Sequence, residues 1–130
     1  MEATEIAGTL IINDEGLLLL YRKDQEWWEV PGGKVKDEES PTQAAVREAS
    51  EEIGVDVELE KPFFSGEFES NNELFLWHGY IGKTTENPEI QEEKFSELKY
   101  FDAEDIDEED LAPNLRQIEP ALRRVLRAKT

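Results

Sequence analysis

The run over residues 33–55, GKVKDEESPTQAAVREASEEIGV, constrains the fold more than any other part of this chain. Ser40 and Pro41 predict the start of a helix, because serine is a preferred N-cap and proline fits the first helical position. Gly54 predicts its end after Ile53, because glycine readily adopts the left-handed conformation that follows a helix. The sequence therefore predicts a helix over residues 41–53, and the remaining elements must pack around it.

This helix has an apolar side and an acidic side at about 100° per residue. The apolar side carries Val46, Ala49 and Ile53, and the roughly opposite side carries Glu48, Glu51 and Glu52. Carboxylates at this spacing repel one another, so a cation or a paired arginine must offset them. Arg47 lies four residues before Glu51 and can pair with it, or it can brace the loop that carries Glu39.

Carboxylate oxygens of this kind select hard cations, chiefly Mg²⁺, with Mn²⁺ as a working substitute. The preceding turn offers a further ligand, because nothing shields the backbone carbonyls of Gly32 and Gly33. On composition alone, the three glutamates are interpreted equally well as the solvated side of a helix in an acidic protein. The glycine turn and Glu39 favour the metal site.

Charge and composition exclude several classes of function. The chain has 32 acidic and 14 basic residues and a formal net charge of −18, which disfavours non-specific binding to nucleic acid or to an anionic membrane. The absence of cysteine excludes disulfides, thiolate zinc sites and a cysteine nucleophile. No secretory leader and no apolar stretch of the roughly 20 residues that span a bilayer is evident. We expect an acidic cytoplasmic protein.

The other segments predict strands on both sides of this helix and a second helix at the end. Residues 6–12 and 17–21 predict a hairpin around a turn, and residues 28–30 a short extended segment. Further strands are expected over residues 55–59, 63–68, 74–81 and 99–101. Asp102 or Asp105 is expected to start a short acidic helix, and residues 115–126 have helical apolar spacing. The order indicates one α/β domain over residues 1–130, with a mixed β-sheet sandwiched between α-helices.

The run over residues 33–55 resembles the Nudix box, G-x5-E-x7-R-E-U-x-E-E-x-G-U, where U is a bulky aliphatic residue. The matching residues are Gly33, Glu39, Arg47, Glu48, Glu51, Glu52, Gly54 and Val55. Ala49, at the first aliphatic position, is the one departure, and it affects packing rather than chemistry. The order of the flanking strands and the terminal helix is also similar to a Nudix domain.

This resemblance implies a Nudix fold and Mg²⁺-dependent hydrolysis of a nucleoside diphosphate linked to another moiety, by attack of water on phosphorus. It implies metal ligation by the carbonyl of Gly32 and by Glu48, Glu51 and Glu52. It also implies that Arg47 orients the glutamates, while Gly33, Glu39 and Gly54 support the loop and the helix. The general base is either Glu48 or a glutamate of the later loop, where Glu93 is our first choice as base or ligand and Glu92 our second.

Substrate recognition lies outside the box. Asn114 lies in a segment, residues 111–114, that resembles the region where MutT-type enzymes place an asparagine against a purine base; its other interpretation is a helix N-cap. Trp77 is a candidate for stacking on a base, although aromatic residues in strands more often belong to the core. Trp27 and Trp28 are candidates for lining the pocket, and the other interpretation of Trp28 is packing against the core.

The function that we expect is MutT-like release of a nucleoside monophosphate and pyrophosphate from a nucleoside triphosphate. The alternatives are an ADP-ribose or nucleotide-sugar pyrophosphatase and, in another class, a non-catalytic nucleotide sensor or an acidic interaction domain. A homodimer is expected from the same resemblance, with neither nucleic acid nor membrane as a partner.

Overall fold

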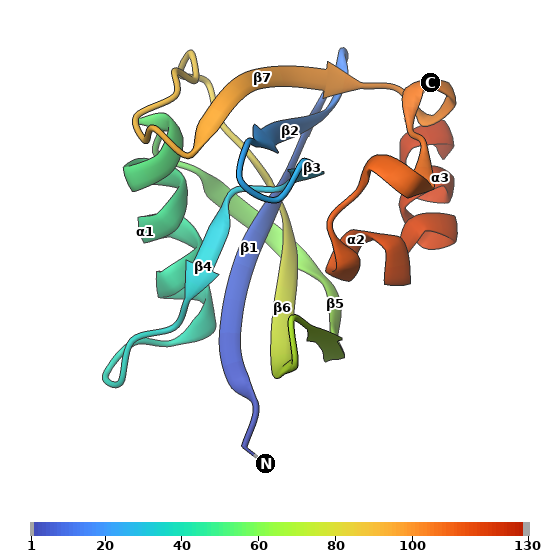
Figure 1. Ribbon diagram of the computed structural model, residues 1–130. Coiled ribbons are helices and arrows are strands. Elements are labelled where there is room, and N and C mark those ends of the chain that lie inside the picture. Colours follow the sequence, from blue (N-terminus) through green and yellow to red (C-terminus); the bar gives the residue numbers. More distant parts are fainter. Residues whose placement is uncertain (1, 129–130) are drawn as a thin grey trace.

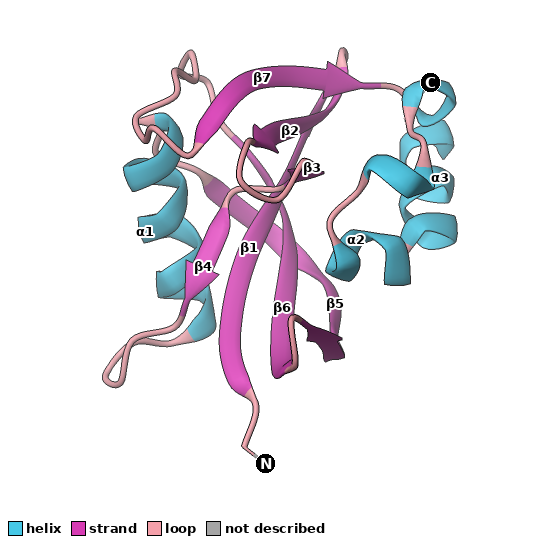
Figure 2. Ribbon diagram, viewed as in Figure 1, coloured by secondary structure: helices cyan, strands magenta, loops and turns pink. Residues whose placement is uncertain are grey.

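A mixed sheet lies between two helical layers in the computed structural model, which describes residues 2–128 (Figure 1). This arrangement confirms the expected α/β class. The strands are β1 (Thr4–Asn13), β2 (Gly16–Arg22), β3 (Trp27–Glu29), β4 (Gly32–Lys34), β5 (Glu58–Ser70), β6 (Glu73–Lys83) and β7 (Phe95–Phe101). The helices are α1 (Pro41–Ile53), α2 (Pro113–Gln117) and α3 (Glu119–Ala128), with two short 3₁₀ turns at Ala103–Asp105 and Glu108–Asp110. Figure 2 shows α1 on one side of the sheet and α2 and α3 on the other.

Strand β1 is the centre of the sheet, whose path runs β3-β2-β1-β6-β5. It is parallel to β6 and antiparallel to β2, which together with its turn forms the expected hairpin. The beginning of β1 also pairs with β4, where Gly8 lies opposite Gly32. This pairing holds the glycine turn against the middle of the sheet and thereby fixes the entry to α1.

The leucine run of β2 is buried on both sides because successive side chains of a strand point to opposite faces. Leu17 and Leu19 pack in the cluster that includes α2 and α3. Leu18 and Leu20 pack in the cluster that includes Ala49 and Ile53 of α1. A continuous apolar run therefore suits a strand that is covered by helices on both faces.

Helix α1 begins and ends where the sequence predicts. Ser40 Oγ accepts a hydrogen bond from Gln43 N at 3.2 Å, and Gln43 Oε1 accepts one from Ser40 N at 2.9 Å. At the other end, Gly54 has φ 68° and ψ 25°, and its N–H donates to Ser50 O. Local signals thus set both ends of the helix that carries the carboxylates.

Three expectations about the elements need correction. Residues 55–59 and 63–68 are expected as separate strands, but β5 begins only at Glu58, is continuous, and takes up Pro62 between two register shifts. The C-terminal helix is broken at Ile118, because Pro120 has no N–H to donate back along the helix. The segment after Pro31, expected only as a turn, also forms β4. The short acidic helix does follow Asp102, as a 3₁₀ turn.

Candidate active site

The glycine turn and the acidic side of α1 meet at the candidate site. Glu52 is fully buried, and its Oε1 accepts a hydrogen bond from Gly32 N at 2.9 Å. A Cβ added at Gly33 would lie 2.3 Å from Glu48 Oε2, so only glycine leaves room for that carboxylate. The turn therefore positions two of the three glutamates by close backbone approach.

Arg47 holds together the groups that flank this turn. Its guanidinium forms a bidentate pair with Glu39, with Nε–Oε2 at 2.7 Å and Nη2–Oε1 at 2.9 Å. Nη1 donates to Oε1 of Glu48 at 2.7 Å and to Oε1 of Glu51 at 2.8 Å, and Nη2 donates to Lys34 O at 2.9 Å. Both interpretations of Arg47 from the sequence are therefore confirmed: it pairs with Glu51 and braces the loop through Glu39.

The charges in this network shift the pKa of Glu39. The hydrogen bonds from Arg47, followed by the one from the Lys36 amide, lower its pKa from 4.5 to about 2. Glu39 also raises the pKa of the guanidinium of Arg47 above its ordinary value. The pair therefore stays ionised throughout the physiological pH range.

Glu52 has the opposite electrostatic environment. Burial raises the pKa of its carboxyl to about 8, although the Gly32 amide and the ammonium of Lys94 act in the other direction. Its Oε2 is buried and has no hydrogen-bond donor, and Lys94 Nζ lies 3.4 Å away. A buried carboxylate oxygen without a donor is costly unless a cation lies near it.

These residues fit a divalent metal by their chemistry, since they offer only oxygen atoms and one of those atoms is buried without a donor. They are not yet gathered around one point. Within residues 2–128, no three Asp, Glu or His side chains converge closely enough to hold an ion. Glu48 and Glu51 are turned toward Arg47, so metal binding requires their side chains to move.

The loop before β7 brings Lys94 and Glu92, our second choice, toward Glu52, but not Glu93. Glu93, our first choice as base or ligand, is exposed, and in the described part of the chain no hydrogen bond or ion pair joins it to the glutamates of α1. Its neighbour Lys94 instead lies between Glu52 and Glu92, with Nζ 3.5 Å from Glu92 Oε1. In the sequence, the feature that sets Lys94 apart is that it is one of two lysines in the acidic segment over residues 86–110.

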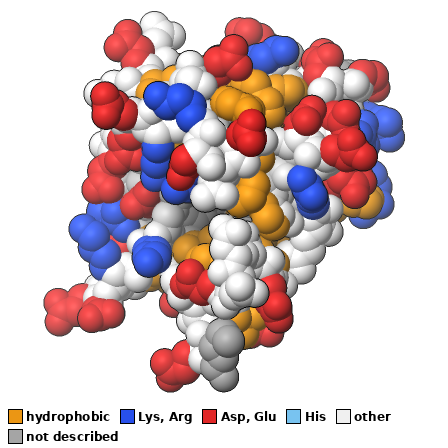
Figure 3. Space-filling model, in the orientation of Figure 1, with side chains coloured by type: hydrophobic (Ala, Val, Ile, Leu, Met, Phe, Trp, Pro, Cys, Tyr) orange, Lys and Arg blue, Asp and Glu red, His pale blue; other side chains and the backbone are white. Residues whose placement is uncertain are grey.

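A pocket of about 520 Å³ opens beside the glycine turn. Figure 3 shows a hollow in this face with apolar atoms at its floor and basic side chains beside it. The charged lining residues are Arg22, Glu29, Lys34, Glu48, Glu73 and Lys94. The aromatic and amide lining residues are Gln25, Trp27, Phe68, Asn71, Phe75, Trp77 and Asn114. The pocket therefore combines a charged wall near α1 with aromatic and amide groups suited to a flat, polar ring.

The residues proposed for substrate recognition differ in whether they reach the pocket. Asn114 is the second residue of α2 and lines the pocket, while Ala112 precedes that helix, so the N-cap interpretation is wrong. Trp77 also lines the pocket, but it is 1% exposed and belongs to the core, and its buried Nε1 has no acceptor. Trp28 instead packs with its ring centre 5.3 Å from that of Tyr21 and 4.9 Å from that of Phe101, and its neighbour Trp27 lines the pocket.

The comparisons with known proteins agree with this geometry. Residues 3–122 match the NUDIX domain family. The structure of a MutT NUDIX hydrolase from Burkholderia pseudomallei superposes with a TM-score of 0.85 at 26% identity, over 96% of this chain and 99% of that one.

Two curated relatives match over shorter stretches. An 8-oxo-dGTP diphosphatase from Proteus vulgaris is 61% identical over 31 residues, which are 24% of this chain and 28% of that protein. A CTP pyrophosphohydrolase from Escherichia coli is 32% identical over 84 residues, which are 62% of each chain. The matched stretch thus covers less than two thirds of either relative.

Proposed function

This chain belongs to the Nudix family, and we propose that it hydrolyses nucleoside triphosphates to a nucleoside monophosphate and pyrophosphate in a Mg²⁺-dependent reaction. One observation supports this activity more than any other. The side chains of Glu48 and Glu52 meet the glycine turn beside a pocket with charged and aromatic walls. A polyphosphate and a base need these two environments side by side.

In this proposal, the carbonyl of Gly32 and the carboxylates of Glu48, Glu51 and Glu52 would hold Mg²⁺. When bound, the metal would neutralise phosphate charge and make the attacking water more acidic. Arg47 pairs with Glu48 and Glu51 and ties them to the loop through Glu39, and these two side chains would turn from the guanidinium to reach the metal. Glu51, which is exposed, is the easiest of the three to turn.

We propose Glu48 as the residue that takes the proton from the attacking water. It lines the pocket, whereas Glu93 is exposed and does not. A general base must come within about 3 Å of the water, or act through one further water, and Glu48 is the α1 carboxylate that faces the substrate space.

We propose that Asn114 contacts the edge of the base, because its amide offers both a donor and acceptors at the pocket wall. The relatives are an 8-oxo-dGTP diphosphatase and a CTP pyrophosphohydrolase, so one has a purine substrate and the other a pyrimidine. The asparagine favours a purine here.

A substrate panel tests the proposal. Canonical and oxidised dNTPs, CTP, ADP-ribose, nucleotide sugars and dinucleoside polyphosphates would each be incubated with Mg²⁺, and the products resolved by chromatography. Release of monophosphate and pyrophosphate from a triphosphate supports the proposal. Turnover confined to ADP-ribose or a nucleotide sugar would keep the metal chemistry and overturn the triphosphate assignment. Metal-dependent nucleotide binding without turnover would indicate a sensor.

We further propose a cytoplasmic protein that folds as one domain over residues 1–130 and forms a homodimer. Light scattering after size-exclusion chromatography tests the assembly directly. A mass near twice the 15.0 kDa of the chain is the expected result, and a mass of one chain would overturn it.

A further inference from the structure

Lys94 is a cation of the chain itself within the carboxylate site. Its Nζ lies 3.4 Å from Glu52 Oε2 and 3.5 Å from Glu92 Oε1, and both oxygens are buried without a hydrogen-bond donor. The same ammonium lies 5.1 Å from the centre of the Phe95 ring, and the side chain also lines the pocket. One flexible cation therefore reaches both the buried oxygen of Glu52 and the space for substrate.

The backbone around Lys94 is held in place from both sides. Gln91 N donates to Glu52 O at 2.8 Å, and Glu89 N donates to Ile53 O at 3.0 Å, which ties the loop to the end of α1. Lys23 N donates to the carbonyl oxygen of Lys94 at 3.1 Å, which ties it to the end of β2. The approach of the ammonium to Glu52 is therefore a consequence of the fold.

The contact is close enough to balance charge but too long for a strong hydrogen bond. Charge-assisted N–H···O bonds are typically about 2.7–2.9 Å, so the 3.4 Å separation leaves Oε2 of Glu52 without a firm partner. A divalent ion would bind this oxygen more strongly than the ammonium does. It would also be repelled by the ammonium for as long as that group stays beside Glu52.

We propose that Lys94 stands in for the metal ion at Glu52 in the metal-free protein, opposes metal binding there, and turns to the substrate's polyphosphate once metal and nucleotide are bound. This inference rests on the proposed function, since it takes Glu52 as a metal ligand. It assigns Lys94 two effects: the ammonium lowers the affinity for free metal, and its contact with the polyphosphate raises the affinity for the nucleotide.

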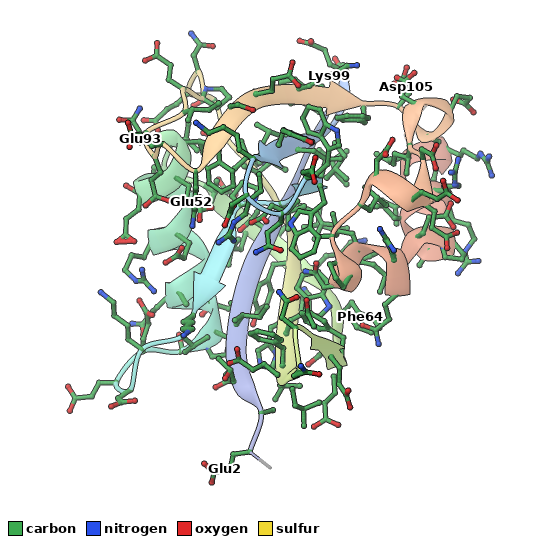
Figure 4. All side chains as sticks on the ribbon, in the orientation of Figure 1. Glu2, Glu52, Phe64, Glu93, Lys99 and Asp105 are labelled. Atoms are coloured by element: carbon green, nitrogen blue, oxygen red, sulfur yellow. The ribbon has the colours of Figure 1, made fainter. Side chains whose placement is uncertain are left out.

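Calorimetric titration with Mn²⁺ alone, without nucleotide, tests the first part. We expect Lys94→Met to bind Mn²⁺ roughly tenfold more tightly than wild type, because a unit charge beside a divalent ion is only partly screened at a half-exposed position. Lys99→Met is the matched control. Its Nζ lies 5.0 Å from the Phe101 ring centre, so it removes the same charge from a similar contact on β7. In the view of Figure 4, Lys99 lies well apart from Glu52.

Equal or weaker Mn²⁺ binding by Lys94→Met than by Lys99→Met would overturn the inference. Thermal melts establish that both variants are folded, and Lys94→Gln replaces Lys94→Met if the latter does not fold. Lys94→Arg keeps the charge and should bind Mn²⁺ within about twofold of wild type.

Steady-state kinetics tests the second part. At saturating Mg²⁺ we expect Lys94→Met to raise KM for the triphosphate at least fivefold while kcat changes less, because a contact made by both bound substrate and transition state is lost. A lower kcat with unchanged KM would contradict a phosphate contact. If wild type binds no Mn²⁺, the proposed metal site itself fails; if it binds Mn²⁺ and the two lysine variants do not differ, only the role of Lys94 fails.

Discussion

Arg47 makes more polar contacts in the candidate site than any other side chain described above. It binds three carboxylates and a backbone carbonyl, and the planar fork of its guanidinium suits the bidentate pair with Glu39. Lysine offers a single ammonium and cannot reproduce this geometry. The arginine therefore orders the loop and the helix together, at the level of a single residue.

The lowered pKa of Glu39 predicts how the free energy of unfolding depends on pH in acid. A carboxyl whose pKa falls from 4.5 to about 2 on folding contributes stability that is fully present above pH 4.5 and is lost as the pH falls toward 2. We expect wild type to exceed Glu39→Gln in free energy of unfolding at pH 7 and the two to converge toward pH 2. Urea denaturation at a series of pH values measures this difference, and a difference independent of pH would refute the assignment.

Asn114 leads to a prediction about base preference. Its side chain lines the pocket at the second position of α2, and the helix does not depend on it as a cap. We expect Asn114→Ala to leave the melting temperature within a few degrees of wild type and to lower the purine-to-pyrimidine ratio of kcat/KM roughly tenfold, which is typical for loss of a base-reading contact. An unchanged ratio would remove its proposed role.

At the scale of elements, the turn between β3 and α1 joins the sheet to the acidic helix. Gly32 lies so close to β1 that a Cβ would be 2.6 Å from Ala7 O and 2.8 Å from the Cα of Gly8. Gly33 faces the movable carboxylate of Glu48 instead. Two adjacent glycines therefore serve different purposes, one in packing and one in the site.

These contacts predict opposite outcomes for two alanine variants. We expect Gly32→Ala to lose roughly 1–3 kcal/mol of stability, because fixed backbone atoms must shift. Gly33→Ala should lose less stability and more than tenfold in kcat/KM, because Glu48 must move away. Urea midpoints and kinetics on the same samples measure both quantities. Equal effects of the two substitutions on both would contradict this division.

The elements that sequence reasoning predicted well are those with local signals. Ser40, Pro41 and Gly54 set the ends of α1 through contacts within a few residues. The sequence predicts two strands in place of the long β5, because Pro62 interrupts the strand pattern. In the structure, register shifts on each side of the proline keep the strand continuous. The break at Ile118 was missed because apolar spacing continues across it, although Pro120 carried the necessary signal.

At the scale of the whole molecule, the charged lining of the pocket is balanced although the protein is strongly acidic. The net charge is −18, whereas the pocket is lined by equal numbers of basic residues (Arg22, Lys34 and Lys94) and acidic residues (Glu29, Glu48 and Glu73). None of the helices within residues 2–128 has the length and apolar character needed to cross a membrane. A polyphosphate would therefore meet balanced charge at the pocket, on a molecule that repels anions overall.

The net charge predicts a salt dependence of stability. Raising the NaCl concentration from 0.1 M to 1 M shortens the Debye length from about 10 Å to about 3 Å and screens the repulsion among surface carboxylates. We expect the melting temperature to rise across this range, both in wild type and in Glu52→Gln, because the repulsion is spread over the surface. A falling melting temperature would show that attractive ion pairs, such as those of Arg47, outweigh it.

The pocket could be predicted from the sequence only in part. The carboxylates and Asn114 follow from spacing and resemblance. Glu48 and Asn114 line the pocket, whereas Glu52 is buried and Glu51 is exposed. Trp27, which the sequence offers as a pocket residue, lies there because β3 folds back on β2. The role of Lys94 could not be predicted in this way, because its position depends on the hydrogen bonds that tie a distant loop to α1 and β2. Contacts between residues far apart in the chain leave no local pattern to read.

Turnover of the preferred triphosphate across a Mg²⁺ titration, for wild type and Glu52→Gln, tests the central claim most directly. We predict that wild type requires Mg²⁺ and that Glu52→Gln loses roughly a thousandfold in kcat, since metal stabilisation of several kcal/mol corresponds to about that factor. A urea midpoint close to that of wild type would establish that the variant is folded. A folded Glu52→Gln with near-normal turnover would contradict the assignment of the metal site to α1.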